Sequence, residues 1–405
     1  MEKIEDIKAR VSALIDEAYD SGAADKAAEC QDKLDEAVKK AADRAYLLGG
    51  AAVLRELASC LSPEPEPEPQ PEPKPEPMFS LENDAVAAFM TDPTYYAPGF
   101  AIGSGLSVVD KYIVDAVEGS RQCWTEQPKP IPIDFTQIFD EDGNEVPIIG
   151  GIYNLIPGRR YTYTSPEGDG AFRTEPNTVR MIRMADSDPV VNIRDIGGYP
   201  CQSGGHVAYG KVIRSSTLNK LTRASLNARI LQAIGVTDVI TSSSSNPART
   251  DLGLWDGEYI AVDAYKTVIK KRNGILATFN RIFSDVESGG CVLLHCYSGT
   301  DRTGTLVSLI LGLLGVSEGD IIKEWELTCF FCWFVRVRIS DWEKRAAVRK
   351  ECPEGQLRQF FKEMKRTYGQ NGENFQQQCQ TFLVKTVGLD ADKVEAFKQR
   401  MITFD

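Results

Sequence analysis

Residues 295–304, with the sequence HCYSGTDRTG, carry the residue types that phosphate chemistry requires. Cys296 precedes Arg302 by six positions, and Gly299 stands near the middle of the segment between them. A thiolate is a strong nucleophile, and a guanidinium offers a planar fork that matches two phosphate oxygens. We therefore expect residues 296–302, named here the cysteine loop, to bind a phosphoryl group and to attack it.

The flanks of the cysteine loop predict how it is held. Residues 290–295 form a short apolar run that is typical of a buried strand, and residues 303–314 stay apolar for long enough to predict a buried helix. In such a strand–loop–helix unit, backbone N–H groups converge on an anion at the positive end of the helix. The predicted phosphate-binding residues are Tyr297, Ser298, Gly299, Thr300, Asp301 and Arg302.

Four side chains have predicted roles in this chemistry. A helix N-terminus and a nearby guanidinium favour the thiolate form of a cysteine, so Cys296 is the expected nucleophile. Arg302 would stabilise the equatorial oxygens during phosphoryl transfer. The Thr303 hydroxyl would donate to the thiolate as it leaves a phosphocysteine intermediate, and His295 would orient the loop. A chance match, in which Cys296 is only a small buried hydrophobe, is the competing interpretation.

The loop resembles that of the cysteine-dependent protein tyrosine phosphatases. Its ending, Asp-Arg-Thr-Gly, is similar to the bacterial tyrosine/serine phosphatases and to phosphoinositide phosphatases. Three further segments resemble that group: residues 192–199 (NIRDIGGY), 209–216 (YGKVIRSS) and 388–394 (GLDADKV). The resemblance covers roughly residues 180–402, and it implies a phosphatase fold and a reaction that needs no cofactor and no metal.

The chain departs from this group at three places. Thr300 stands where the group usually has a lysine, and the loss of that charge should weaken binding of highly phosphorylated inositol lipids. Residues 241–246 (TSSSSN) stand where an Asp-Leu-Arg segment is usual, which predicts a polar, flexible loop. Residues 324–328 (EWELT) replace an Asp-Tyr-Glu-Leu type segment, a difference interpreted as structural.

Two aspartates are candidates for the general acid that protonates the leaving oxygen. Asp301 resembles the loop aspartate of the bacterial group. Asp263 precedes Cys296 by thirty-three residues, a spacing similar to that of the acid and nucleophile in dual-specificity phosphatases. Asp301 could instead brace the loop, and Asp263 could be an ordinary turn residue. A positioned acid is worth roughly a hundredfold or more in rate, so mutation should separate the two.

Three polar residues near Gly197-Gly198 are expected to support the site. The resemblance puts Asn192, Arg194 and Asp195 near the cysteine loop, where they would brace a tight glycine turn. The chain has only two histidines, and they lie far apart in sequence, which argues against a zinc site.

Composition narrows the partners and the compartment. A net charge of −12 disfavours DNA and RNA, whose binding depends on phosphate neutralisation. The longest apolar run is too short to cross a bilayer, and the acidic start does not resemble a secretory signal. Ten irregularly spaced cysteines suit a reducing cytoplasm. A phage-encoded protein, or one exported without a signal, would look the same.

The first 77 residues predict a helical module and a spacer. Residues 1–62 are rich in Ala, Glu and Lys with apolar residues at helical spacing, which predicts a coiled-coil-like segment. Self-association through residues 1–61 and a helical hairpin folded on itself are both open. Residues 63–77 alternate Pro and Glu, so they should form an extended linker.

The remaining chain predicts two domains. Residues 78–180 contain short alternating or β-rich runs with turn signals and predict a small immunoglobulin-like β-sandwich. From residue 181 to 405, strands near 235–241 and 290–296 alternate with helices near 266–288 and 303–315. This α/β pattern predicts a parallel sheet flanked by helices.

These observations favour a phosphatase that hydrolyses phosphomonoesters, chiefly phosphotyrosine, through a phosphocysteine intermediate. Phosphoserine, phosphothreonine, phosphoinositides and inositol phosphates are alternative substrates. A pseudophosphatase that binds phosphorylated partners within a larger assembly is the competing hypothesis. A third hypothesis places the helical, linker and β-rich segments in a phage or cell-surface assembly that carries the phosphatase fold.

Overall fold

A computed structural model describes residues 76–96, 112, 128–185, 190–330 and 353–404. The chain divides into two compact units, residues 1–75 and 76–405. The predicted helical segment, and all but the last two residues of the predicted Pro-Glu linker, lie outside the described residues. The described residues therefore all belong to the second unit. No helix in its described part is long and apolar enough to span a membrane.

The centre of the unit is a five-stranded sheet with the order β5-β7-β10-β8-β9. The strands are β5 (Arg194–Asp195), β7 (Val212–Ser215), β8 (Val236–Thr241), β9 (Asp256–Tyr259) and β10 (Cys291–His295). Strands β7, β10, β8 and β9 are parallel, and only the short β5 is antiparallel to its neighbour. The predicted α/β architecture with a parallel sheet is therefore confirmed.

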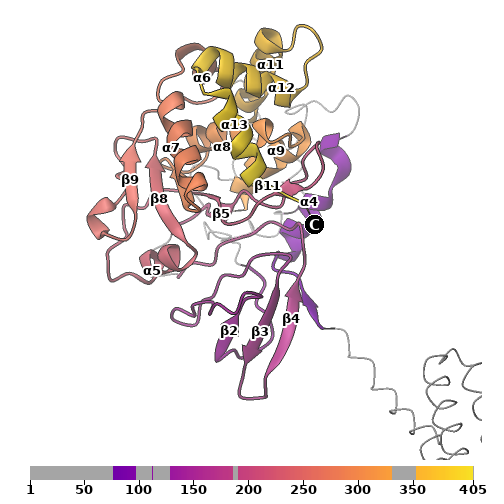
Figure 1. The fold of residues 1–405 in the computed structure, drawn as a ribbon, viewed down its shortest axis with the longest axis vertical. Coiled ribbons are helices and arrows are strands. Elements are labelled where there is room, and N and C mark those ends of the chain that lie inside the picture. Colours follow the sequence, from indigo (N-terminus) through magenta and orange to yellow (C-terminus); the bar gives the residue numbers. More distant parts are fainter. Residues whose placement is uncertain (1–75, 97–111, 113–127, 186–189, 331–352, 405) are drawn as a thin grey trace, which may run out of the picture. The chain divides into compact units, whose positions relative to one another are not determined.

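Alternate residues of the central strands face two different cores, because side chains of a strand point to opposite faces in turn. One face carries Val212, Ile240, Val292 and Leu294 and packs against α7 (Ile275–Glu287), α8 (Asp301–Leu313) and α9 (Glu318–Glu326). The other carries Ile213, Val239, Cys291 and Leu293 and packs against α5 (Leu226–Ala233). Helix α5 accordingly lies across the sheet from α7 and α8 (Figure 1).

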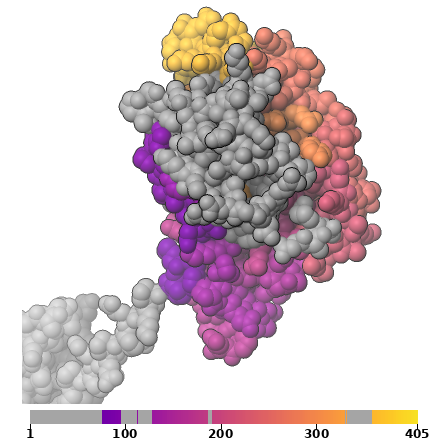
Figure 2. All heavy atoms as spheres, turned by 180° about the vertical axis from the view of Figure 1, so that it is seen from behind, coloured from indigo at the N-terminus to yellow at the C-terminus, as the bar shows by residue number. Residues whose placement is uncertain are grey.

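The C-terminal helices complete the larger core. They are α11 (Pro353–Tyr368), α12 (Phe375–Gln380), a π-helical turn at Thr381–Val387 and α13 (Ala391–Met401), followed by β11 (Ile402–Thr403). Strand β11 pairs with β6 (His206–Val207). In Figure 2 these helices, in yellow, lie at the end of the unit opposite the purple and magenta β-rich segment.

The helix predicted over residues 266–288 is two helices, α6 (Lys266–Lys271) and α7. The break occurs because Arg272 and Gly274 adopt left-handed backbone conformations, with φ of 56° and 71°. A Cβ at Gly274 would lie 2.2 Å from the Ala261 carbonyl oxygen, so only glycine allows this close approach. The prediction of one continuous helix was wrong because the apolar pattern continues across the turn.

Residues 78–180 contain one described sheet rather than two. Its order is β1 (Met78–Phe79), β4 (Gly170–Thr174), β3 (Arg160–Thr164) and β2 (Gln137–Phe139), with β1 parallel to β4 and the other pairs antiparallel. One small core covers it, formed by Leu81, Ile131, Ile138, Leu155, Tyr161 and Phe172. A sandwich of two sheets is not confirmed in the described part of this segment.

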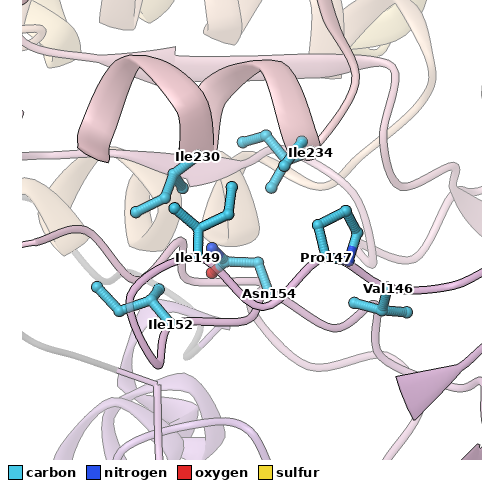
Figure 3. A pocket seen from close by; sticks show the side chains of 8 residues that line it. Val146, Pro147, Ile149, Ile152, Asn154, Ile230 and Ile234 are labelled. Atoms are coloured by element: carbon cyan, nitrogen blue, oxygen red, sulfur yellow. The ribbon is translucent and has the colours of Figure 1, made fainter. Parts of the chain in front are cut away.

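The β-rich segment packs directly on the larger domain at two places. Val86 and Phe89 of α4 (Asp84–Thr91) join the large core, where the ring centroids of Phe89 and Phe330 are 5.4 Å apart. Elsewhere, Ile149 and Ile152 line an apolar hollow together with Ile230 of α5 and Ile234, the residue that follows α5 (Figure 3). The predicted boundary near residue 180 thus falls inside one compact unit, and it stays a prediction.

A buried carboxyl at this junction predicts a pH-dependent stability. Val179 N–H donates to Glu82 Oε1 at 2.6 Å, and burial raises the pKa of Glu82 to about 7. Between its ordinary value of 4.5 and about 7, the folded chain binds more protons than the unfolded chain, so stability falls as pH rises. Between pH 4.5 and 8, ionisation of Glu82 should therefore lower the free energy of unfolding of the wild type by up to about 3 kcal/mol. Glu82→Gln should remove this loss.

Urea unfolding at several pH values measures this difference. Glu167→Gln, at an exposed glutamate in the turn between β3 and β4, is the matched control and should leave the pH dependence of the wild type unchanged. If Glu82→Gln and the wild type lose the same free energy of unfolding across this window, Glu82 is ionised in the folded chain at neutral pH and the burial argument fails.

Candidate active site

The cysteine loop connects the central strand β10 to the N-terminus of α8. Because β10 lies between two parallel neighbours, the loop leaves the sheet at its carboxyl-terminal edge, where open α/β sheets bind ligands. Gly299 has φ of +71°, and a Cβ there would lie 2.2 Å from the Ser215 carbonyl oxygen. Only glycine can therefore occupy the bend of the loop.

The carbonyl groups of the loop are held by donors outside it. Three consecutive carbonyl oxygens accept such bonds: Tyr297 from the Thr217 N–H at 3.0 Å, Ser298 from Asn192 Nδ2 at 3.0 Å, and Gly299 from Arg214 Nη2. Before them, the Cys296 carbonyl lies 3.1 Å from His295 Nδ1, and after them the Thr300 carbonyl accepts the first bond of α8. These bonds fix the orientation of each peptide in the loop.

The N–H groups of the same peptides are unpaired. Among the described residues, none accepts a hydrogen bond from the backbone N–H groups of Ser298, Gly299, Thr300, Asp301 or Arg302. A buried N–H without a partner costs free energy, so native proteins rarely keep one without a ligand. Consecutive free N–H groups at a helix N-terminus form a concave site for an anion. The geometry therefore suits a phosphate or a similar oxyanion.

A buried ion network supports this orientation from behind the loop. Glu324 of α9 accepts from Arg194 Nε at 2.9 Å and from Arg214 Nη1 at 2.6 Å. Arg194 Nη1 also donates to Asn192 Oδ1 at 2.5 Å, so both residues that hold the Ser298 and Gly299 carbonyls depend on Glu324. Burial, together with the neighbouring Arg214, lowers the pKa of Arg194 to about 10, and the guanidinium stays charged at neutral pH.

Asp195 does not reach the loop with its two predicted companions. Its carboxylate accepts from the N–H groups of Gly197 and Gly210 at 2.9 and 2.7 Å, and from Arg180 Nη1 at 3.0 Å. Burial raises the pKa of Asp195, against the lowering effect of Arg180. Asp195 thus braces the glycine turn, whereas Asn192 and Arg194 join the network that contacts the cysteine loop.

The predicted nucleophile Cys296 and its neighbours His295 and Thr303 are all buried. The Cys296 side chain makes no hydrogen bond with a described residue, and the residue is 2 % exposed. Thr303 Oγ1 is also buried and unpaired, so the predicted bond from Thr303 to the sulfur is absent and the O–H remains available as a donor. Burial lowers the pKa of His295 to about 4, which keeps the imidazole neutral at pH 7.

The predicted phosphate-binding arginine contacts an adjacent strand end. Arg302 Nη1 donates to the Ser242 carbonyl at 2.7 Å, just beyond β8. Ser242 N–H in turn donates to the His295 carbonyl at 2.9 Å. Ser242, Ser243 and Asn246 are buried. Asn246 Nδ2 donates to Ser243 Oγ, and Ser242 Oγ donates to the His295 carbonyl, so the segment expected to be a flexible loop is packed against the site. Sequence analysis missed Ser242 because its contact is made by a backbone carbonyl.

The two candidate acids have different surroundings. Asp301 Oδ1 accepts from the Tyr265 hydroxyl at 2.5 Å, at the first turn of α8. Asp263 forms a long ion pair with Lys271 at 3.9 Å, and its side chain is 27 % exposed. Tyr265, like Arg214 and Glu324, is a site residue that sequence analysis did not single out. Nothing in the local sequence marks these three, because each contacts a residue at least 36 positions away.

The described residues contain no cluster of three or more His, Cys, Asp or Glu side chains that could hold a metal ion.

Tyr297, at the start of the cysteine loop, is 46 % exposed. An exposed aromatic ring at this place can contact the ring of a bound molecule.

Curated proteins with similar sequences match only parts of the chain. The triple specificity protein phosphatase PtpB of Mycobacterium tuberculosis is 33 % identical over 70 residues, which cover 17 % of this chain and 25 % of PtpB. A tyrosine-protein phosphatase of Nostoc commune is 33 % identical over 55 residues, which cover 13 % of this chain and 19 % of that protein. The matches thus span a quarter or less of the length of these relatives.

Two solved structures are similar at low TM-scores. TpbA of P. aeruginosa has a TM-score of 0.25 and 19 % identity, and the match covers 38 % of this chain and 89 % of TpbA. The core catalytic domain of the PP-IP phosphatase SIW14 from S. cerevisiae has a TM-score of 0.23 and 19 % identity, covering 37 % and 94 % of the two chains.

The model of the tyrosine phosphatase family matches residues 185–403, which is more than half of the chain. The matched region contains the parallel sheet, the cysteine loop and the helices that support it. The strand, loop and helix that position Cys296 and Arg302 thus lie within a family-wide pattern rather than a chance motif. The chain therefore belongs to the tyrosine phosphatase family.

Proposed function

We propose that this protein is a cysteine-dependent phosphatase that hydrolyses phosphomonoesters, with phosphotyrosine as its main substrate class. One observation carries the proposal: donors outside the cysteine loop hold the carbonyls of Tyr297, Ser298 and Gly299, and the N–H groups of residues 298–302 have no partner among the described residues. That arrangement stabilises the equatorial oxygens of a phosphoryl group as charge develops on them.

The first step transfers the phosphoryl group to sulfur. Cys296 Sγ attacks phosphorus, an S–P bond forms, and the bond from phosphorus to the leaving oxygen breaks. Arg302 exchanges its contact with the Ser242 carbonyl for two phosphate oxygens, since a charge-assisted bidentate pair is stronger than a bond to a neutral carbonyl. Asp301 gives a proton to the leaving oxygen, which departs as an alcohol or a phenol.

The second step releases phosphate. Water gives a proton to Asp301 and attacks phosphorus, the S–P bond breaks, and Cys296 returns as the thiolate. The unpaired Thr303 Oγ1 is the donor proposed to stabilise that thiolate. His295 stays neutral and orients the loop through its contact with the Cys296 carbonyl.

Two features support phosphotyrosine over phosphoinositides. Tyr297 presents an exposed aromatic side chain at the start of the loop. Thr300 is neutral where the resembling phosphoinositide phosphatases usually carry lysine, so a second or third phosphate on the same substrate has no charged partner at this position. One missing charge contact of about 1.4 kcal/mol corresponds to roughly a tenfold difference in kcat/KM.

A substrate panel tests this proposal. We expect phosphotyrosine peptides to exceed phosphoserine peptides, phosphoinositides and inositol phosphates in kcat/KM by about tenfold or more. Activity should persist in EDTA, because a thiolate nucleophile needs no metal-bound water. The absence of turnover on every phosphomonoester, including 4-nitrophenyl phosphate, would refute the proposed function. A preference for inositol phosphates would refute the substrate assignment alone.

A further inference from the structure

Tyr265 has an unusual backbone conformation close to the cysteine loop. Its φ of 50° and ψ of −135° lie outside the regions that tyrosine ordinarily occupies, and the residue is 2 % exposed. Such strain costs on the order of 1–3 kcal/mol and persists only where surrounding contacts hold it. Here the Tyr265 N–H donates to Thr305 Oγ1 of α8 at 2.8 Å, and Thr305 Oγ1 donates to the Asp301 carbonyl at 2.8 Å.

The side chain of Tyr265 lies between two site residues. Trp325 Nε1 is 3.2 Å from the Tyr265 hydroxyl oxygen, and that oxygen is 2.5 Å from Asp301 Oδ1. An indole N–H can only donate, so the tyrosine oxygen accepts from Trp325 and directs its own hydrogen to Asp301. Gly304 permits this close approach of the indole to α8, because a Cβ at Gly304 would lie 2.8 Å from the Trp325 ring.

The direction of this bond determines which oxygen of Asp301 can carry a proton. Oδ1 is occupied as an acceptor, whereas Oδ2 makes no hydrogen bond with a described residue. The acid proton must therefore reside on Oδ2. Because the tyrosine also fixes the carboxyl rotamer, Oδ2 has one defined position relative to the cysteine loop. A general acid needs this constraint, since proton transfer requires hydrogen-bond distance to the leaving oxygen.

We infer that Tyr265 is the positioning residue of the general acid Asp301, and that the hydrogen bond from Trp325 holds the Tyr265 hydroxyl in place. The inference rests on the proposed phosphatase function and assigns to the strained backbone the task of bringing the phenol hydroxyl to Asp301. It also distinguishes the two acids, because Asp263 lies two residues before Tyr265 and has only a long ion pair with Lys271.

Tyr265→Phe tests the inference through leaving-group dependence. The variant removes one hydroxyl and keeps the ring. We expect kcat/KM to fall about 10- to 100-fold for phenyl phosphate, whose leaving group needs a proton, and less than about threefold for 2,4-dinitrophenyl phosphate, whose leaving group does not. The Kd for inorganic phosphate should stay within about threefold of wild type. Tyr161→Phe, also 2 % exposed but in the β-rich segment, is the matched control and should not change this ratio.

A double-mutant cycle identifies the acid that Tyr265 positions. In an Asp301→Asn background, Tyr265→Phe should cause little further loss, because the group that it positions is already absent. In an Asp263→Asn background it should keep its full effect. An equal loss on both aryl phosphates, additivity with Asp301→Asn, or non-additivity with Asp263→Asn would each overturn the inference while the wild type remains an active phosphatase. An inactive wild type would overturn the proposed function and this inference with it.

Discussion

Cys296→Ser is expected to lower kcat by on the order of 10⁴-fold or more while the protein still binds inorganic phosphate. Serine is nearly isosteric with cysteine, and the Cys296 side chain makes no hydrogen bond with a described residue that the change would break. The carbonyls that orient the loop are held by Thr217, Asn192 and Arg214, none of which contacts the sulfur in the described structure. The cysteine loop should therefore keep its phosphate-binding geometry when the nucleophile is lost.

Two measurements are needed together. Single-turnover kinetics with 4-nitrophenyl phosphate measure the rate of the transfer step, and isothermal titration measures how tightly the cysteine loop binds inorganic phosphate. We expect the Kd for phosphate to stay within about threefold of wild type. In the wild type, phosphate should also protect Cys296 from alkylation by iodoacetate, because both reagents occupy the same loop.

Cys291→Ser is the matched control for this prediction. Cys291 lies five residues earlier, on β10, and its side chain belongs to the core on the α5 face of the sheet. Burial raises the pKa of the Cys291 thiol, which disfavours a thiolate at this position. An unpaired buried hydroxyl there should cost about 1–3 kcal/mol of stability and leave the kcat of folded protein unchanged. Retained turnover in Cys296→Ser would refute the cysteine mechanism.

The elements around the cysteine loop could be predicted from sequence because their signals are local. The apolar run before His295 and the longer run after Arg302 place β10 and α8 within two residues of their observed ends. The short spacing from Cys296 to Arg302 also identifies the loop between them. The break between α6 and α7 was missed, because the close approach of Gly274 to the Ala261 carbonyl is a tertiary contact that no periodicity reports.

The groups that orient the loop could not be predicted in the same way. Arg214 acts on Gly299 across 85 positions, and Glu324 acts on Arg194 across 130 positions. Each is an ordinary charged residue in its local sequence, and only the fold makes it buried. Glu324 occurs in the EWELT segment, which was interpreted as structural. Within that structural role, its carboxylate joins Arg194 and Arg214, the two arginines of the network behind the loop.

The segment at residues 241–246 illustrates a further limit of sequence analysis. Four consecutive serines predict a solvated loop, because serine competes for backbone hydrogen bonds and favours turns. The segment nevertheless follows β8, whose neighbour in the sheet is β10, so its first residues emerge beside the cysteine loop. There the Ser242 carbonyl accepts from Arg302, and Asn246 donates to Ser243. Position in the sheet, rather than residue type, gives this segment its contact with the site.

Glu324→Gln should have the largest effect on stability, because it leaves two buried guanidinium groups without their counter-charge. Both Arg194 and Arg214 are fully buried and bond to this carboxylate within 2.9 Å. Removing one partner of a buried ion pair costs about 3–5 kcal/mol, since the remaining charge stays desolvated. The free energy of unfolding in urea measures this cost.

The same substitution should impair catalysis in the molecules that remain folded. Arg214 holds the Gly299 carbonyl, and Arg194 holds Asn192, which bonds to the Ser298 carbonyl. Without Glu324 these carbonyls lose their fixed donors, and the N–H groups on the other side of the same peptides lose their convergence on the phosphate. We expect kcat/KM for 4-nitrophenyl phosphate to fall about 10²-fold, comparable to the loss of one oxyanion donor.

Glu258→Gln supplies the control, because it makes the same change in an ion pair at the surface. Glu258 pairs with Arg281 at 2.9 Å, and its side chain is 55 % exposed, so the loss should cost no more than about 1 kcal/mol and no activity. If Glu324→Gln is no more destabilising than Glu258→Gln, the buried arginines do not depend on Glu324. If it is destabilising but fully active when folded, the network stabilises the domain without orienting the loop, and the geometry of the phosphate site must come from the backbone of β10 and α8 alone.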